Sequence, residues 1–546
     1  MKITKFHLVS LGCAKNSVDS ESMAQLLENA GYARSELADE AELIIVNTCG
    51  FIAPARDESL RILSELAAHK RKGQLLIAAG CLTQRYGIEV AQKVAGIDGI
   101  LGTRRWMDIV EVVQRLQSSQ QAGRPDRFQR DAPPSGWRRE RRRVSGKVSP
   151  KPVRSQTVQP GDVPSPLLGT GVPPERNTVG MEPTVQLGDV PSPLLGTGAP
   201  PERNTVGMTP TVQPVYHLPE AADMGPEEPD VLRVAVQGAS AYLKIADGCR
   251  RRCAFCAIPL IKGRPVSRPL QAILREAHQL QARRVKELIL IAQDTTDYGS
   301  DLGLKDGLAT LLERLVEEAP EIPWLRILYA FPGYVTDRLI EVMASHPQIL
   351  PYLDMPLQHA HPATLRRMRR PANLDWVYRT LEKIRAAMPA LALRSTFIVG
   401  YPGETEDEFD TLLDFVREIR FDRLGAFQFS FEPGTASQAL GDPIPPEVKQ
   451  ARWERLMELQ QGISLSKNQA FVGQTLQVLI EGQAELLDEE RSRRNLGQLS
   501  VGRSYRDAPE IDGVVLVEGD LPVGSFVSVR ITSAMPYDLS GVVSEK

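Results

Sequence analysis

The sequence predicts an α/β protein with an N-terminal parallel α/β sheet domain, a partial (β/α) barrel, a small C-terminal antiparallel β-barrel and a disordered insertion. Strand-like apolar runs alternate with amphipathic helical segments on both sides of the insertion, a pattern typical of parallel sheets. The last part of the chain has short runs separated by turns, which favours a small barrel. At 546 residues the chain has room for about three or four domains. We place the domains at residues 1–120, 233–468 and 469–546, with the insertion at 121–232.

Three apolar runs in the first domain lead directly to cysteines. The runs are 6–11, 42–46 and 75–79, helical segments follow at 17–30, 54–69 and 86–94, and the cysteines are Cys13, Cys49 and Cys81. Because the carboxyl ends of parallel strands meet at one edge of a sheet, three neighbouring strand ends would bring these thiols to one point. Three thiols without a fourth form a metal site with an open position, which suits chemistry. The alternative is three unrelated cysteines packed in a core.

The segment 121–232 differs abruptly in composition. It holds 20 of the chain's 41 prolines within 112 residues and includes a basic run at 138–143. Residues 157–183 recur as 184–210, with 24 identities over a 27-residue period. Two copies rich in Pro and Gly, without apolar periodicity, cannot bury a core, so we predict disorder. The basic run could contact ribosomal RNA, although a solvated charged segment is the simpler interpretation.

Six strand-like runs alternate with helices between residues 233 and 468. The runs are 242–245, 287–292, 324–329, 352–355, 393–399 and 423–429, and the clearest helices are 270–283, 308–318 and 406–418. Six such units predict a partial (β/α) barrel, whose active site lies at the carboxyl ends of the strands.

A loop with three cysteines follows the first strand of this barrel. Cys249, Cys253 and Cys256 have the spacing Cys-x3-Cys-x2-Cys. Thiolates are the usual ligands of iron–sulfur clusters, and this spacing lets one loop hold three corners of a cubane cluster. With no fourth cysteine close by, the last corner stays open for a reactant. The alternative is a zinc site that takes a distant fourth ligand.

Other strand ends of the barrel offer polar and glycine contacts. Gln293 follows one strand-like run, and Gly400 and Gly403 follow another, where glycine would let the backbone approach a ligand closely. Both segments also fit ordinary strand-to-helix turns. Arg394 could pair with a ligand carboxylate, because a guanidinium matches carboxylate geometry, or could form a salt bridge inside the barrel.

The final domain has an acidic balance. Strand-like runs at 475–480, 513–517 and 526–531 predict the small barrel. Residues 469–546 contain 7 Lys and Arg against 12 Asp and Glu, a net charge of −5. Such a surface repels phosphate and attracts a basic partner. We therefore do not expect nucleic acid as the substrate.

The composition and the positions of the cysteines indicate the cellular compartment. The net charge of −3 predicts no general attraction to nucleic acid or membranes. No apolar stretch approaches the roughly 18–20 residues that span a bilayer, and the first residues lack the apolar core of a signal peptide. We therefore expect a cytoplasmic protein without a membrane partner. All six cysteines fall into the two groups of three, which in a reducing compartment favours metal binding over disulfides.

The cysteine motifs resemble those of a known family. The loop with Phe255 just before Cys256 resembles the cluster loop of the radical S-adenosylmethionine (SAM) enzymes. The segments Leu-Gly-Cys-Ala-Lys-Asn at Cys13, Asn-Thr-Cys-Gly-Phe at Cys49 and Gly-Cys-Leu-Thr-Gln-Arg-Tyr at Cys81 resemble the motifs of the methylthiotransferase N-terminal domain. The final barrel resembles the TRAM domain, a module that holds the substrate.

The resemblance to radical SAM methylthiotransferases implies two 4Fe-4S clusters and SAM as cofactors. The cluster on Cys249, Cys253 and Cys256 would cleave SAM reductively, and the cluster on the N-terminal cysteines would bind or deliver the inserted sulfur. It also implies an electron donor such as a flavodoxin or ferredoxin. The SAM contacts that we expect come from Phe255, Gln293, Arg394, Gly400 and Gly403.

Residues 353–360 and 502–513 resemble the branch of the family that modifies a ribosomal protein. That branch acts on the β-carbon of an aspartate in small-subunit ribosomal protein twelve, a carbon that no side-chain base deprotonates at neutral pH. A tRNA-adenosine methylthiotransferase would share all six cysteines, but the acidic final domain argues against it. The other alternative is a non-catalytic iron–sulfur factor of ribosome assembly, which would need neither an open iron nor nucleotide contacts.

Overall fold

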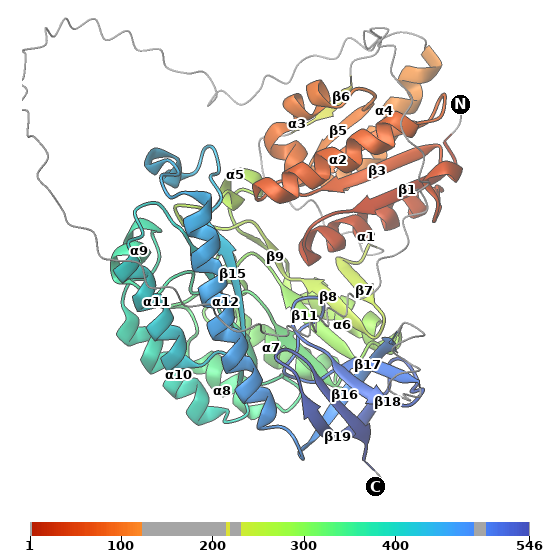
Figure 1. Ribbon diagram of the computed structural model, residues 1–546. Helices are drawn as coiled ribbons and strands as arrows, with labels where there is room; N and C mark the ends of the chain where they lie inside the picture. Colours follow the sequence, from red (N-terminus) through yellow and green to blue (C-terminus); the bar gives the residue numbers. More distant parts are fainter. Residues whose placement is uncertain (1–2, 123–213, 219–230, 485–497, 545–546) are drawn as a thin grey trace, which may run out of the picture. The chain divides into compact units, whose positions relative to one another are not determined.

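The computed structural model describes residues 3–122, 214–218, 231–484 and 498–544 (Figure 1). The chain divides into two units, one made of Met1–Phe128 with Met208–Lys546 and the other of Gln129–Gly207. All described residues belong to the first unit. Most of the predicted insertion therefore lies outside the described residues.

A six-stranded parallel sheet forms the N-terminal part of the chain (Figure 1). Its strands lie in the order β2-β1-β3-β4-β5-β6 and are β1 (Lys5–Ser10), β2 (Ala33–Arg34), β3 (Leu43–Thr48), β4 (Leu75–Gly80), β5 (Gly99–Gly102) and β6 (Val215–His217). Its helices are α1 (Ala14–Asn29), α2 (Ala53–His69), α3 (Cys81–Lys93) and α4 (Ile109–Ala122). Because β3 and β4 are buried along their whole length, both begin with continuous apolar runs, Leu43–Val46 and Leu75–Ala79, rather than alternations.

The last strand of this sheet corrects part of the predicted disorder over 121–232. Val215–His217 forms β6, which pairs in parallel with β5. His217 Nε2 lies 2.6 Å from a carboxylate oxygen of Asp108, and Val231 and Leu232 are buried. Three residues are too few to show a period of two, so only the pairing with β5 reveals the strand.

Two helices begin earlier than the sequence pattern predicts. α1 starts at Ala14 rather than at residue 17, and Cys13 is its N-cap. α3 starts at Cys81 rather than at residue 86, with Tyr86 in a non-helical conformation inside it (φ −134°). These two cysteines therefore stand at the starts of helices that lead away from the strand ends.

Six parallel strands form the central barrel, which confirms the predicted (β/α) units. They are β8 (Ser240–Lys244), β11 (Glu287–Ile291), β12 (Trp324–Ile327), β13 (Tyr352–Asp354), β14 (Ala392–Val399) and β15 (Arg423–Gln428). They form two sheets, β12-β11-β8-β7 and β13-β14-β15, which meet where Leu325 bridges Ile349. The added strand β7 (Val234–Gln237) pairs antiparallel with β8.

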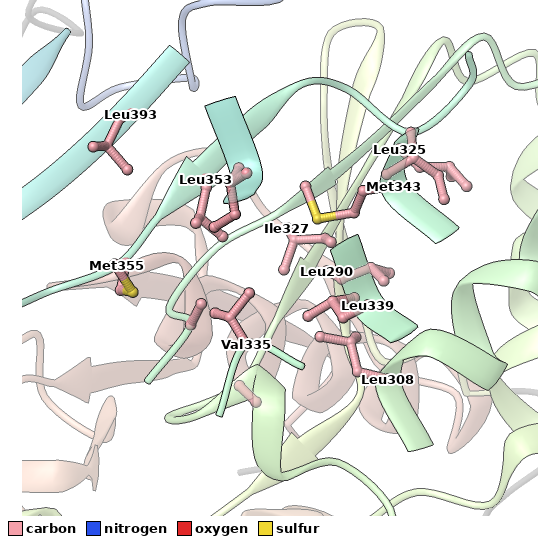
Figure 2. Packing of buried hydrophobic residues seen from close by; sticks show 14 of the residues in the cluster. Leu290, Leu308, Leu325, Ile327, Val335, Leu339, Met343, Leu353, Met355 and Leu393 are labelled. Carbon is pink, nitrogen blue, oxygen red and sulfur yellow. The ribbon is translucent and has the colours of Figure 1, made fainter. Parts of the chain in front are cut away.

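Helices cover the outside of this barrel. They are α6 (Leu270–Ala282), α7 (Gly307–Glu318), α8 (Asp337–Ser345), α10 (Leu374–Ala387), α11 (Glu406–Ile419) and α12 (Pro446–Gln469). The main hydrophobic core lies between strands and helices; Figure 2 shows Leu290, Leu325, Ile327 and Leu353 of the strands beside Leu308, Leu339 and Met343 of the helices.

The inside of the barrel holds a second core that other parts of the chain complete. Its strand residues include Tyr242, Ile289, Ile291 and Tyr352, which alternate with the residues facing the helices. Ala14 and Val18 of α1 pack into this core, and so do Leu479 and Ala508 of the C-terminal domain. The barrel is therefore packed together with both neighbouring domains.

The C-terminal domain is a closed five-stranded barrel in the order β16-β17-β18-β20-β19. Its strands are β16 (Thr475–Gln483), β17 (Leu499–Arg503), β18 (Val515–Glu518), β19 (Phe526–Ala534) and β20 (Leu539–Val543). The three predicted runs correspond to β16, β18 and β19, whereas β17 and β20 are additional. β18 and β20 pair in parallel, so the barrel is not wholly antiparallel as predicted. All five residues of β17 are buried, including the polar Ser500 and Arg503, so its burial does not follow the apolar–polar pattern of its sequence.

The loop after β17 docks on the central barrel. Arg503 Nη2 lies 2.6 Å from Glu287 Oε2 at the start of β11. Tyr352 at the start of β13 donates a hydrogen bond from its hydroxyl to Asp512 Oδ2, at 2.6 Å. The segment 502–513 therefore closes the end of the barrel where its strands begin.

Candidate active site at the strand ends

The N-terminal sheet gathers three thiols at one edge. Cys13, Cys49 and Cys81 follow β1, β3 and β4, which are adjacent strands. Thr48 and Gly80, the residues before Cys49 and Cys81, are register partners. Cys49 and Cys81 are buried, whereas Cys13 is exposed. The three thiols thus share one edge of the sheet, with Cys13 on its open side.

Asn16 holds these strand ends together. Its Nδ2 donates hydrogen bonds to the carbonyl oxygens of Leu11 (2.8 Å) and Thr48 (3.0 Å). The thiol of Cys81 lies 3.6 Å from Asn16 Oδ1. One buried amide therefore ties the segments that carry all three cysteines. Sequence reasoning did not single out Asn16, although it stands in the motif around Cys13.

Gly12 allows the backbone before Cys13 to approach Cys49. Its φ is +93°, and a Cβ at this position would lie 2.7 Å from Cys49 Cβ and 2.9 Å from Cys49 Sγ. Both the conformation and the close approach require glycine. This residue therefore sets the separation between two of the three thiols.

The second group of thiols lies in the loop between β9 (Ala246–Asp247) and α5 (Ile258–Ile261). The N–H of Cys249 donates to the Gly263 carbonyl at 3.1 Å, and the N–H of Cys256 donates to the Cys253 carbonyl at 3.1 Å. All three thiols are half-buried. The first hydrogen bond folds the loop back on itself, and the second ties Cys256 to Cys253.

Cationic side chains adjoin this loop. Arg370 Nη1 lies 3.6 Å from Cys253 Sγ, and the backbone N–H of Arg251 lies 3.4 Å from Cys249 Sγ. The guanidinium of Arg251 also pairs with Asp294, with Nε 2.7 Å from Oδ2. Donors of this kind favour the ionised form of a thiol, because hydrogen bonds to an anion are stronger than those to a neutral group.

Burial disfavours the ionised form of most of these thiols when no metal is bound. It raises the pKa of Cys81 and Cys256 to about 12 and that of Cys249 to about 11, and it also raises the pKa of Cys49. A bound metal deprotonates a coordinating thiol outright. Without a bound metal, the thiols are therefore poorly suited to nucleophilic chemistry at neutral pH.

The donor chemistry of the two sites fits 4Fe-4S clusters. Each group supplies three thiols, with no fourth thiol left for it in the sequence. Thiolates are the usual ligands of such clusters. Three thiolates would leave one corner of a cubane open for a reactant.

The two thiol sites adjoin each other. Cys81 packs in one buried cluster with Ala257 and Ile261. Ala257 directly follows Cys256 in the sequence, and Ile261 ends α5. A thiol of the N-terminal site therefore contacts the segment that carries a thiol of the barrel site.

Buried charges join the same two parts of the chain. Lys262 Nζ lies 2.9 Å from Asp19 Oδ2 of α1 and 3.0 Å from Asp247 Oδ2 of the barrel. Lys244, the last residue of β8, also pairs with Asp19. Although burial alone would raise the pKa of Asp247, Lys244 and Lys262 bring it well below its usual value. Two buried cations and two buried carboxylates thus neutralise one another.

Phe255 and Gln293, both predicted SAM contacts, lie near the cluster loop. Phe255 is partly buried and packs beside Met368, Tyr401 and Phe429. Gln293 Nε2 donates to Asp247 Oδ1 at 2.8 Å, while its Oε1 is buried and has no hydrogen-bond partner among the described residues. That oxygen is an acceptor available to a ligand.

The three other predicted contacts have protein neighbours in this structure. Arg394 Nη1 lies 2.9 Å from Asp354 Oδ1, so the salt bridge foreseen as the alternative is present. At Gly400 a Cβ would lie 2.4 Å from Lys449 Cγ, so a side chain of α12 makes the close approach there. Gly403 is exposed at φ +79°, and a Cβ there would lie 3.5 Å from Arg367 Nε. Their SAM-binding roles remain predictions.

Strand ends of the barrel carry two further unusual residues. Tyr329 follows β12 at φ +64°, and Gln358 follows β13 at φ +74°. Non-glycine residues rarely adopt this conformation, and such strain concentrates at functional sites. Lys15 Nζ lies over the Tyr329 ring, 3.3 Å from its centroid. No sequence pattern marks the two conformations, whereas Lys15 stands two residues after Cys13 and could have been noticed there.

Three parts of the chain match known families. Residues 5–102 match the family described as uncharacterized protein family UPF0004, residues 243–416 match the radical SAM superfamily, and residues 472–543 match the TRAM domain. Members of the radical SAM superfamily use a 4Fe-4S cluster and SAM. Together with the two thiol sites, these matches define a radical SAM enzyme with a TRAM domain.

Relatives align over nearly the whole chain. The ribosomal protein uS12 methylthiotransferase RimO of Chloroflexus aurantiacus is 45% identical over 537 residues, which cover 98% of this chain and 99% of the relative. RimO of Roseiflexus sp. is 43% identical over 541 residues, covering 99% and 97%. The chain belongs to the RimO family of radical SAM methylthiotransferases. Among solved structures, TsrM, a radical SAM methyltransferase from Kitasatospora setae, aligns with a TM-score of 0.48 at 15% identity, covering 82% of this chain and 76% of TsrM.

Proposed function

We propose that this protein inserts a methylthio group at the β-carbon of an aspartate in ribosomal protein uS12. The observation that carries the proposal is the junction of two three-thiol sites, where Cys81 of the N-terminal sheet packs on Ala257 and Ile261 beside the barrel loop. Methylthiolation needs a source of radical chemistry and a source of sulfur at one place. Two adjoining sites with an open position each meet that need.

The two sites have separate tasks in this proposal. With 4Fe-4S clusters bound, Cys249, Cys253 and Cys256 would support reductive cleavage of SAM, and the N-terminal thiols would support methylation and delivery of sulfur. Arg370 and the backbone N–H of Arg251 donate toward the barrel thiolates and stabilise their negative charge. The free acceptor of Gln293 and the ring of Phe255 are the proposed SAM contacts at this loop.

A radical is required because the target carbon bears no acidic proton. Side-chain bases with pKa values near neutrality do not deprotonate such a carbon. The barrel interior is packed by Ala14 and Val18 of α1 together with Ile291 and Leu328 near the carboxyl ends of the strands. This apolar packing excludes water from the inside of the barrel below the thiol sites.

The surface of the TRAM domain favours a basic protein over RNA as the substrate. Arg503 and Arg506 are buried, so they add little to the surface charge. Glu510, Glu518 and Asp520 are exposed. An acidic docking surface attracts a basic ribosomal protein and repels phosphate.

We also propose a flavodoxin or ferredoxin as the electron donor and the cytoplasm as the location. Radical cleavage of SAM consumes one electron per event, and small electron-transfer proteins deliver single electrons. Among the helices of the described residues, none is long and apolar enough to cross a membrane.

An anaerobic assay with the full chain, SAM and a reductant tests the two tasks separately. Cys253→Ala should abolish release of 5′-deoxyadenosine, because it removes one of the three ligands of the SAM-cleaving site. Cys49→Ala should leave this release in place and stop methylthio insertion. Normal insertion by the Cys49 variant would refute the role of the N-terminal site.

The substrate is tested in the same reaction by mass spectrometry. A gain of one methylthio group on uS12, with none on tRNA, supports the proposal. A gain on tRNA adenosine would select the other branch of the family. Absence of 5′-deoxyadenosine from the wild type would favour a non-catalytic iron–sulfur protein.

A further inference from the structure

Lys15 connects the N-terminal thiol site with the mouth of the barrel. It lies in the first turn of α1, two residues after Cys13. Its ammonium lies 3.3 Å from the centroid of the Tyr329 ring, two residues beyond the carboxyl end of β12. The side chain therefore reaches from one thiol site to the edge of the barrel where the other thiol loop stands.

The charge of Lys15 is not used by an ion pair. Among the described residues, its ammonium contacts Tyr329 and has the Cys13 thiol as an electrostatic neighbour, and no carboxylate lies within ion-pairing distance of it. Asp354, a carboxylate whose charge also acts on Lys15, is already engaged. Its Oδ1 pairs with Arg394 Nη1 at 2.9 Å, and its Oδ2 accepts a hydrogen bond from the Tyr329 N–H at 3.1 Å.

A half-buried cation without a carboxylate partner is uncommon, because leaving water costs free energy that an anion normally offsets. The two other lysines near the thiol sites, Lys244 and Lys262, both have such partners. Lys15 is half-buried, so part of the residue remains exposed. The aromatic face of Tyr329 holds the ammonium in place without neutralising it.

We propose that Lys15 binds the side-chain carboxylate of the substrate aspartate, with Tyr329 positioning its ammonium. This inference rests on the proposed function and identifies a substrate-binding residue for it. The carboxylate carbon is bonded directly to the β-carbon. An ion pair between this carboxylate and Lys15 therefore holds the target carbon one bond away from the bound group. Since Lys15 is two residues from Cys13, the same contact holds that carbon close to the N-terminal thiols.

The local charges support an acidic rather than a neutral side chain at this point. Asp354 pairs with Arg394, which also lies 3.4 Å from Asp512 Oδ1, so this guanidinium offsets part of the negative charge near an incoming carboxylate. An asparagine would lose the charge-assisted hydrogen bond while keeping the same shape. Lys15 would therefore discriminate between aspartate and asparagine in the substrate.

The test measures binding of uS12 in the absence of reductant, so that no turnover occurs. The ligands are fluorescently labelled uS12 with Asp at the target position and the same protein with Asn there. The holoenzyme with reconstituted clusters and SAM should bind the Asp form about tenfold more tightly. The ratio of the affinities for the Asp and Asn forms should fall to about one in Lys15→Met. In Lys15→Arg most of the preference for the Asp form should remain.

Lys5→Met is the matched control, because Lys5 lies in the same domain in an exposed pair with Glu40. It should keep the full Asp-to-Asn ratio. The ratio compares the affinities of two ligands for one protein sample, so a partly misfolded variant affects both affinities equally. Lys15→Gln replaces Lys15→Met if Lys15→Met does not fold.

Three results would overturn the inference. The first is an unchanged ratio of affinities in Lys15→Met, and the second is equally weaker binding of both uS12 forms by this variant. The third is a wild type that binds the Asp and Asn forms equally well. If the wild type binds both forms but never methylthiolates uS12, the proposed function fails instead. The two failures are therefore distinguishable.

Discussion

Gly12 shows how one residue controls the spacing of the N-terminal thiols. Its φ of +93° is a conformation that L side chains rarely adopt, and Cys49 Sγ stands 2.9 Å from the place of its missing Cβ. Gly31, at the end of α1, has nearly the same φ of +90° but no atom within 4 Å of that place. Alanine substitutions at the two glycines would therefore share the backbone strain, but only the one at Gly12 would add crowding against Cys49.

We predict that Gly12→Ala lowers cluster occupancy at the N-terminal site, whereas Gly31→Ala does not. Both variants should lose about 1 kcal/mol or more of unfolding free energy from strain, but only Gly12→Ala displaces Cys49. Anaerobic iron and sulfide analysis should give about half the wild-type content for Gly12→Ala, because the barrel site is unaffected. Equal iron content in the two variants would show that the spacing is not set at Gly12.

At the scale of elements, the junction between β11, β12 and β17 is held by one carboxylate. Glu287 Oε1 lies 2.7 Å from Arg326 Nε, and its Oε2 lies 2.6 Å from Arg503 Nη2. The three side chains are fully or almost fully buried. Burial by itself would raise the pKa of Glu287, but Arg503 and Arg326 outweigh it and lower the pKa to about 2. The carboxylate thus links the TRAM domain to the barrel.

This pKa predicts how stability depends on pH. The unfolded value is about 4.3, above the folded one, so the unfolded state takes up the proton first as pH falls. The contribution of Glu287 is complete above about pH 5 and is lost as pH falls toward 2. We expect Glu287→Gln to lower the unfolding free energy at pH 7 by about 3 kcal/mol and to flatten its pH dependence in that window.

Urea unfolding at a series of pH values measures both effects. Glu65→Gln is the control, because Glu65 forms an exposed pair with Arg61 (side-chain exposures of 55% and 63%). Such pairs contribute less than about 1 kcal/mol. If the unfolding free energy of Glu287→Gln falls as steeply toward acid pH as that of the wild type, Glu287 is not the source of this pH dependence.

Over the whole molecule, buried ion pairs fasten the N-terminal sheet to the barrel. Asp19 of α1 meets Lys244 and Lys262 of the barrel, and all three side chains are at most 5% exposed. Removing one member of a buried charge network leaves the others uncompensated in a medium of low polarity. This network lies beside the contact between Cys81 and α5, so it also keeps the two thiol sites adjacent.

We predict that Asp19→Asn destabilises the protein by about 3 kcal/mol or more. Asp337→Asn should cost less than about 1 kcal/mol, since Asp337 pairs with Lys383 at side-chain exposures of 79% and 59%. Denaturant unfolding followed by fluorescence and by hydrogen exchange of α1 measures both variants. If Asp19→Asn unfolds like the wild type, the network does not fasten the two domains.

The sequence by itself determined the thiols and the architecture around them. Cys13, Cys49 and Cys81 each follow an apolar run, and the Cys249 loop follows the first barrel strand, so local spacing was sufficient to predict both groups and the parallel sheets. Strand and helix periods are local properties that short stretches of sequence carry. The same reasoning missed β6, which is too short to show alternation, and β17, in which polar and apolar residues alike are buried.

Only the tertiary structure decided which of these parts touch. Arg503 and Glu287 are 216 residues apart in sequence, and Lys244 and Asp19 are 225 apart. Contacts at such separations produce no periodic pattern in the sequence. Each charged residue by itself is expected to be exposed, and only its partner explains why it is buried. The same holds for Lys15, whose position over Tyr329 depends on how α1 packs against the barrel.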